Sequence, residues 1–174
     1  MLKLLLAILV LPLLGGCISS PDYPRNWAAI SDDNVCSKII GRYSNIGLHD
    51  SGHKIGLVAL LFPSSASKAD VVEILMDENV LRVEAFNEGV LVKKYAEKID
   101  LASCEKASVS IDEPEPEGGI NREGVVGIGW GSFRLSASDD GDLIVHQNSS
   151  GAGIVLFLPF AGSSWSWSKF SQIE

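Results

Sequence analysis

The chain is short of positive charge, and this shortage excludes several kinds of partner. It has 14 Lys and Arg residues against 22 Asp and Glu residues, for a formal net charge of −8 at pH 7. Proteins that bind nucleic acid rely on clustered basic residues that neutralise phosphates. Anionic membrane surfaces also attract basic segments. We therefore expect no nucleic-acid partner, and a membrane partner would have to be reached by something other than charge.

Motifs that carry catalysis or hold cofactors are also lacking. The sequence contains neither a G-x-S-x-G nucleophile elbow nor a G-x-G-x-x-G phosphate loop. The acidic stretch from Asp112 to Glu117 does not have the spacing of a calcium loop. We expect no cofactor and a protein that is not an enzyme, with a hydrolase as the least favoured alternative.

The histidines are too few and too scattered to indicate a metal site or a catalytic site. His49, Asp50 and His53 are the only cluster, and Gly52 argues against a helix that would place both imidazoles on one face. We expect a solvated turn here and no bound metal. His146 stands on a predicted strand and would support a hydrolase only if it met the other histidines and a nucleophile.

Long apolar runs are absent except at the start of the chain. There the run from Leu4 to Leu14 is interrupted by Pro12, and at about 1.5 Å per residue it is too short to cross a core of roughly 30 Å as a helix. Lys3 precedes the run, and Gly15 and Gly16 follow it. This order is typical of a secretory signal peptide, which we assign to residues 1–16.

The end of that signal carries a more specific motif. Leu14-Gly15-Gly16-Cys17 resembles the lipobox of bacterial lipoproteins. The resemblance implies cleavage before Cys17, a diacylglyceryl group on its thiol, and a further acyl chain such as palmitate on its amine. Two or more acyl chains anchor a protein stably in a membrane. The alternative is an ordinary signal peptide followed by a chance cysteine.

The residues after the cysteine bear on location. Ile18 and Ser19 stand where an Asp would favour the inner membrane, so the start of the chain resembles that of an outer-membrane lipoprotein. The implied location is the bacterial cell envelope, on the outer membrane and facing the periplasm.

The two other cysteines, Cys36 and Cys104, form an even pair in a chain that we expect to be exported. We predict a disulfide between them, with two buried free thiols as the alternative.

The distribution of apolar residues predicts a mainly β fold. Short strands recur at near-regular spacing and are joined by turns such as Asn87–Gly89 and Asp140-Gly141. We expect an antiparallel meander of about eight or nine strands, closed as a small barrel or open as a strongly curved sheet. The predicted strands are 56–62, 70–76, 80–86, 90–98, 104–111, 124–136, 143–147, 153–160 and 164–170, with a loop at 112–119 and a turn at 149–151.

One short N-terminal helix is expected at 32–40, with Ser31 as its N-cap and Gly41 at its end. Residues 17–30 contain Pro21 and Pro24 and few apolar side chains, which indicates a lipidated tether. Residues 31–174 then form a single β-rich domain.

Tryptophans mark one candidate contact surface. Trp165 and Trp167 are two positions apart on a predicted strand and share a face, and Trp130 lies on another strand. They indicate either packing within the domain or a surface for a ligand or partner.

Spacing in the domain suggests a wider resemblance. The domain resembles small, uncharacterised proteobacterial lipoproteins of β-meander type. The resemblance is carried by Cys36, Ile39-Ile40-Gly41-x-Tyr43-x-Asn45-x-Gly47, Asp140-Gly141-x-Leu143-Ile144-Val145 and Trp167-x-x-Phe170. That resemblance brings no activity with it. Gly41-x-Tyr43 is also similar to the G-x-W start of lipocalins, with Tyr in place of Trp.

Three functions remain open from the sequence. The leading hypothesis is a membrane-anchored envelope lipoprotein whose domain is a non-enzymatic interaction or structural module with an envelope protein partner. The others are a lipocalin-like carrier of an apolar ligand and a hydrolase.

Overall fold

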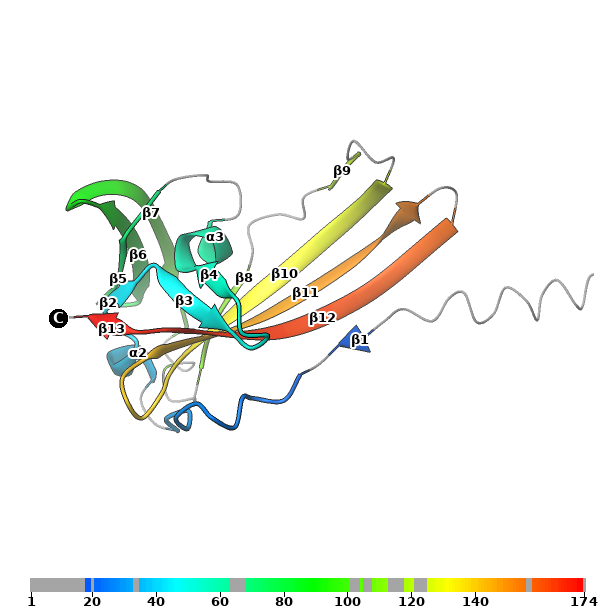
Figure 1. The fold of residues 1–174 in the computed structure, drawn as a ribbon. Coiled ribbons are helices and arrows are strands. Elements are labelled where there is room, and N and C mark those ends of the chain that lie inside the picture. The colour runs from blue at the N-terminus through cyan, green and yellow to red at the C-terminus, as the bar shows by residue number, and fades with distance from the viewer. Residues whose placement is uncertain are drawn as a thin grey trace, which may run out of the picture. The chain divides into compact units, whose positions relative to one another are not determined.

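The fold is mainly β, as the sequence predicts (Figure 1). The structure is a computed structural model, and it describes residues 18–19, 21–32, 35–62, 68–100, 104, 108–112, 118–120, 125–155 and 158–173. Side chains are described for these residues except 18–19, 112, 118–120, 125–130, 155 and 158–160. Within this part of the chain two short helices accompany strands that form two sheets.

The chain divides into two compact units. Unit 1 comprises residues 1–21, 112–132 and 147–165, and unit 2 comprises residues 22–111, 133–146 and 166–174. Three long strands contribute residues to both units: β10 (Val125–Ala137), β11 (Leu143–Val155) and β12 (Leu158–Phe170).

The smaller sheet lies within unit 2 and has five antiparallel strands in the order β13-β2-β5-β6-β7. Its hairpin turn between β6 and β7 places Glu88 and Gly89 at positive φ values of 51° and 78°, the backbone that a tight two-residue hairpin requires. The predicted turn at Asn87–Gly89 is therefore confirmed. The strands are β2 (Gly41–Ser44), β5 (Val71–Asp77), β6 (Val80–Asn87), β7 (Val90–Lys98) and β13 (Gln172–Ile173).

The larger sheet has the order β4-β3-β12-β11-β10-β8, with β9 paired to β10 and β1 paired to β12. The pairing of β1 with β12 is parallel. Over the described residues neither sheet closes on itself, so the open form of the predicted meander is the one observed. The remaining strands are β1 (Ile18–Ser19), β3 (Ile46–His49), β4 (Lys54–Gly56), β8 (Val109–Asp112) and β9 (Gly118–Ile120).

The hydrophobic core of unit 2 draws on both sheets and both helices. Alternate residues of β5 and β6 point into it, which is the period expected of strands with one buried face. Tyr43 is fully buried, its hydroxyl donates to the carbonyl of Ile39 at 3.1 Å, and burial raises its pKa to about 12. Strand residues of this core include Val72, Ile74, Leu81, Val83, Ala85, Phe133, Leu135, Ala137, Leu143, Val145 and Phe170.

The predicted strand at 56–62 is wrong, because most of this apolar run forms helix α3 (Leu57–Leu61). Asn45 starts the helix: its carbonyl accepts from the Leu57 N–H at 2.8 Å, and its side-chain oxygen accepts from the Val58 N–H at 2.8 Å. Leu57, Val58 and Leu60 are buried while Ala59 is exposed. A short apolar run fits either a buried strand or a buried helix, and a distant asparagine decides between them here.

Other boundaries also differ from the sequence prediction. The predicted helix at 32–40 is too long, because Asp32, Ile39 and Ile40 lie outside α2 (Val35–Lys38). The predicted turn at 149–151 is wrong, because β11 runs through these residues to Val155. Its pairing with β10 and β12 outweighs the low strand preference of Gly. The predicted loop at 112–119 contains Asp112 of β8 and the first two residues of β9, and the predicted strand at 104–111 begins only at Val109.

The segment before α2 is packed, which does not fit a tether over all of residues 17–30. Trp27 is 8% exposed. Ile30 forms an antiparallel bridge with Ser138, the Ser31 N–H donates to the carbonyl of Ala137, and the Asp139 N–H donates to that of Ala29. Burial of aromatic surface and the two backbone hydrogen bonds of this bridge hold residues 22–31 in unit 2.

The Asn45 side chain gives a direct test of how α3 is specified. It also donates to the carbonyl of Ala69 at 2.9 Å and is 8% exposed. Asn45→Ala should lower the free energy of unfolding by about 2 kcal/mol or more, because two buried backbone groups lose their partners. Chemical denaturation measures the loss. The exposed Asn26, changed to Ala as a control, should stay within about 0.5 kcal/mol of the wild type; equal effects of the two substitutions would contradict this role.

Candidate functional site

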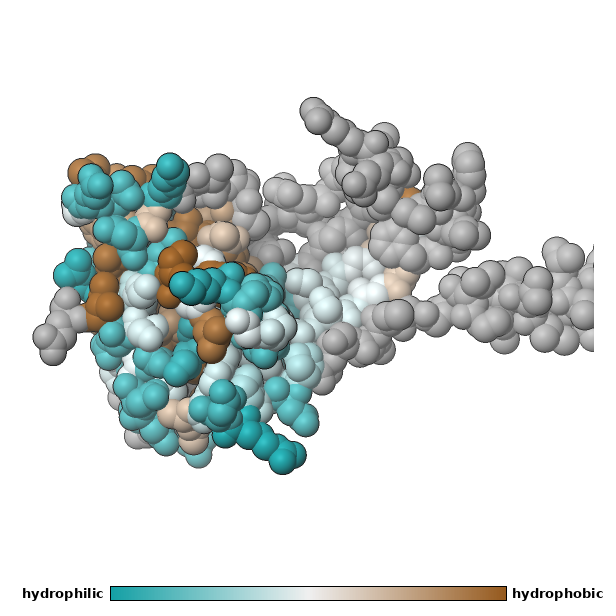
Figure 2. Space-filling view, viewed as in Figure 1, coloured by the Kyte–Doolittle hydropathy of each residue, from teal (hydrophilic) through white to brown (hydrophobic). Residues whose placement is uncertain are grey.

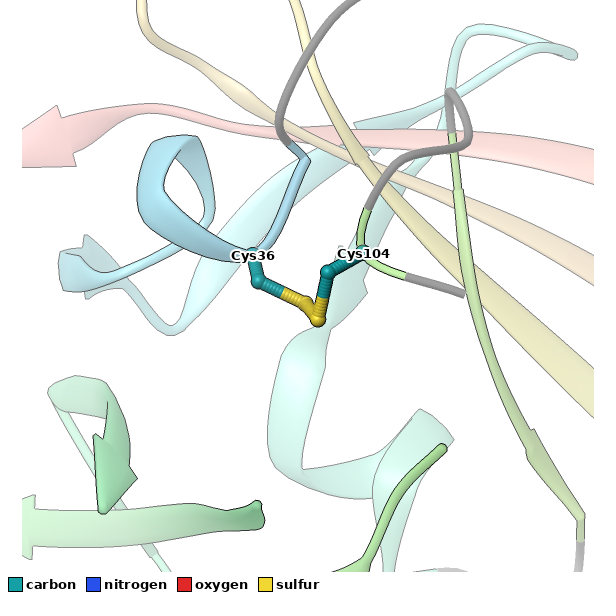
Figure 3. Close-up of a disulfide and its surroundings, with 2 residues drawn as sticks. All are labelled: Cys36 and Cys104. Atoms are coloured by element: carbon teal, nitrogen blue, oxygen red, sulfur yellow. A yellow bond between two sulfur atoms is a disulfide. The ribbon is translucent and has the colours of Figure 1, made fainter. Parts of the chain in front are cut away.

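The predicted disulfide is present and lies at the edge of the core. Cys36 of α2 and Cys104 are bonded, with their Cα atoms 5.0 Å apart. Figure 3 shows the two side chains directed toward one another from α2 and from the segment that precedes β8. Cys36 is 7% exposed and belongs to the core, and Cys104 packs against it. The bridge therefore joins elements that are 68 residues apart.

Loss of this bridge should lower the free energy of unfolding. In the chain-entropy model a loop of this length is worth about 4 kcal/mol. The double variant Cys36→Ala/Cys104→Ala should lose about that much free energy of unfolding in denaturant titrations, and reduction of the wild type should cause a similar loss. A double variant within about 1 kcal/mol of the wild type would contradict the assigned role.

The His49–His53 segment forms a tight turn that brings its two imidazoles together. Their rings stack with centroids 4.3 Å apart. The Ser51 Oγ lies 2.8 Å from Nδ1 of His49 and 2.7 Å from Nδ1 of His53. Gly52 has a φ of +88°, which suits glycine, and its N–H donates to the carbonyl of His49 at 2.8 Å. The predicted turn is present and is ordered by its own side chains, but it is only partly solvated: the side chains of His49 and Asp50 are 18% and 12% exposed.

This turn does not have the geometry of a Ser–His–Asp relay. The carboxylate of Asp50 also contacts Nδ1 of His49, at 2.8 Å. In a relay the acid and the serine contact opposite nitrogens of the imidazole, so that one nitrogen is oriented while the other takes the proton. Here Asp50 and Ser51 share one nitrogen. Among the described residues no group of three or more His, Cys, Asp or Glu side chains is placed to hold a metal ion.

Asp50 connects the turn to the second feature of the site, an aromatic cluster of Tyr23, Trp27, His146 and Trp167. The Asp50 N–H donates to the carbonyl of Trp167, and the Trp167 N–H donates to Oδ2 of Asp50, both at 2.9 Å. His146 stacks on Trp167 with ring centroids 3.9 Å apart. Tyr23 meets both tryptophans edge-on, at 5.2 Å from Trp167 and 5.9 Å from Trp27.

The cluster covers the face of the larger sheet that is turned away from the core. Ile144 is fully buried but lies between Leu143 and Val145, which point into the core, so its own side chain points to the opposite face. His146 alternates with the core residues in the same way. The N-terminal segment with Tyr23 and Trp27 lies on this outer face, so Trp167 is used for packing within unit 2.

The other predicted site residues are not part of this aromatic cluster. Trp165 lies in the part of β12 that belongs to unit 1 and is half-buried. Trp130 lies in β10, but its side chain falls outside the described part of the structure. Cys17 also lies outside the described residues, one position before β1.

Because the aromatic cluster contains His146, we expect the free energy of unfolding to depend on pH. Burial lowers the pKa of His146 below its ordinary value of 6.5, and the positive charge of Arg134 lowers it further. The unfolded chain then takes up a proton before the folded chain does as the pH falls through about 6.5, so stability that is complete above this pH is lost below it.

His146→Phe should reduce that loss, because a phenyl ring can still stack on Trp167 but does not titrate. We expect the free energy of unfolding to fall less between about pH 7.5 and about pH 5 in this variant than in the wild type. Denaturant titrations at the two pH values measure the difference. An identical fall in both proteins would show that His146 does not contribute.

The sequence analysis missed Tyr23 as a member of this region and missed the contact that Asp50 makes with Trp167. Tyr23 lies in a segment assigned to a tether, although its spacing to Trp27 was a signal of shared packing. Asp50 reaches Trp167 from 117 positions away in the chain, and no local pattern indicates such a contact.

Comparisons with protein-family models, curated proteins and solved structures found no match. No helix among the described residues is long and apolar enough to cross a membrane.

Proposed function

We propose that this chain is a lipid-anchored protein of the bacterial cell envelope, whose β-rich chain after Cys17 serves as a non-enzymatic interaction or structural module. The observation that carries the proposal is the position of Leu14-Gly15-Gly16-Cys17 at the end of the only long apolar run. The folded chain begins directly after it, because Ile18 already pairs with Ser163 of β12. Cleavage before Cys17 would thus remove only the leader.

The cysteines support the same proposal from another direction. Cys36 and Cys104 are bonded to each other, as is usual for proteins of an oxidising compartment. Cys17 is the third cysteine of the sequence and is left for the lipid. Since Ile18 and Ser19 follow it, we place the protein on the outer membrane, facing the periplasm.

The proposed role as a module rests on what the side chains of unit 2 do. Asp50 and Ser51 share one nitrogen of His49, and Trp167 is held between Tyr23 and His146. These groups stabilise a turn and a sheet face. No described feature favours the lipocalin-like carrier or the hydrolase over a module that contacts another envelope protein.

Cys17→Ser tests the anchor. The variant should accumulate as uncleaved precursor that carries no acyl chain, because it has no thiol to acylate. Mass measurement of the isolated protein checks both outcomes. The Cys36→Ala/Cys104→Ala variant is the matched control and should be cleaved and acylated. A Cys17→Ser protein that is still cleaved before residue 17 and still in the membrane fraction would overturn the proposal.

A further inference from the structure

The parts of β10, β11 and β12 that belong to unit 1 lack charged residues, which is unusual in this chain. None of residues 125–132 and 147–165 is Asp, Glu, Lys, Arg or His, although 21% of the whole sequence is charged. These residues form the unit 1 parts of β10, β11 and β12. The surface of an acidic protein in water normally carries interspersed charges. Such a long uncharged stretch indicates that these strands contact something other than water.

Several side chains of this stretch are exposed and apolar or small. Ile154 is 50% exposed. In the view of Figure 2, described residues along this part of β12 are pale, near the middle of the hydropathy scale. On β11 and β12, Ala152, Ile154 and Ala161 alternate with the positions that face the core, so these three exposed residues share the opposite face of the sheet. We call them the uncharged strand surface.

The two residues that follow the proposed lipid attachment residue pair with the strand that carries part of this surface. Ile18 and Ser19 of β1 pair in parallel with Ser163 and Ser164 of β12. Cys17 is one residue before Ile18, and one residue spans at most about 3.6 Å. Acyl chains on Cys17 would therefore begin beside the exposed residues of β12, with no linker between them.

We propose that the uncharged strand surface of unit 1 rests on the lipid bilayer that holds the anchor. This inference depends on the proposed lipidation of Cys17. Acyl chains bound in the membrane would keep the surface at a high effective concentration next to the lipid. The unit 1 parts of β10, β11 and β12 carry no charged side chain, so their contact with the bilayer interface does not require a charge to be removed from water. The net negative charge of the protein does not oppose contact with zwitterionic lipid.

A fluorescent label can report this contact directly. Ile154→Cys introduces a thiol that is unique, because Cys17 would be acylated and Cys36 is bonded to Cys104. The acylated full chain, labelled there with an environment-sensitive fluorophore, would be reconstituted into phosphatidylcholine vesicles with and without brominated acyl chains. Val90→Cys is the matched control, since Val90 is also apolar, is 66% exposed and lies on β7 in unit 2.

We expect the label at position 154 to shift its emission to the blue and to lose intensity in brominated vesicles, and the label at position 90 to respond less. A label at 154 that stays in a watery environment on vesicles that carry the protein would overturn the inference alone. So would a blue shift without bromine quenching, which would indicate contact with a second copy. A protein that does not float with vesicles and has an unmodified Cys17 mass would overturn the proposed function together with the inference.

Discussion

The Cys36–Cys104 disulfide is the constraint on which most of unit 2 depends. Between its two cysteines lie all residues of β2 to β7 and of α3, which include four strands of the smaller sheet and the Asn45 contact that starts α3. The bridge closes this loop beside a core to which both sheets contribute. By restricting the unfolded chain, it stabilises pairings between distant strands that would otherwise have a high entropic cost. It also fits a protein that folds outside the reducing cytoplasm.

The sequence predicted the features that depend on local pattern. The alternation in Val80–Asn87, the Glu88–Gly89 turn and the Asp140-Gly141 turn were all recognisable, because each is set by residues close together in the chain. The even cysteine pair was also recognisable. What failed depends on distant contacts: α3 is a helix because Asn45 caps it, and residues 22–31 are packed because Tyr23 meets Trp167. Of the candidate site, the sequence predicted the turn at His49–His53 but not its link through Asp50 to Trp167.

The two units differ in charge, and our proposals assign them different surroundings. Unit 2 has the disulfide, the core and most of the charged residues, and its histidines and tryptophans stabilise local structure rather than forming a catalytic arrangement. Unit 1 has the uncharged parts of three strands and the pairing of β1 with β12, directly after the proposed lipid attachment residue. An acidic protein cannot rely on charge to reach an anionic surface, so the lipid and this uncharged strand surface would have to supply the attachment.

Acylation of Cys17 at the N-terminus of the mature protein is the proposal on which the others rest. The most direct measurement is the mass of the N-terminal peptide of the protein isolated from membranes, determined together with its fragmentation. We predict a peptide that begins at Cys17 and carries a diacylglyceryl group on the thiol, with a further acyl chain on the amine. A membrane-derived protein that keeps residues 1–16, or that begins at an unmodified Cys17, would contradict it.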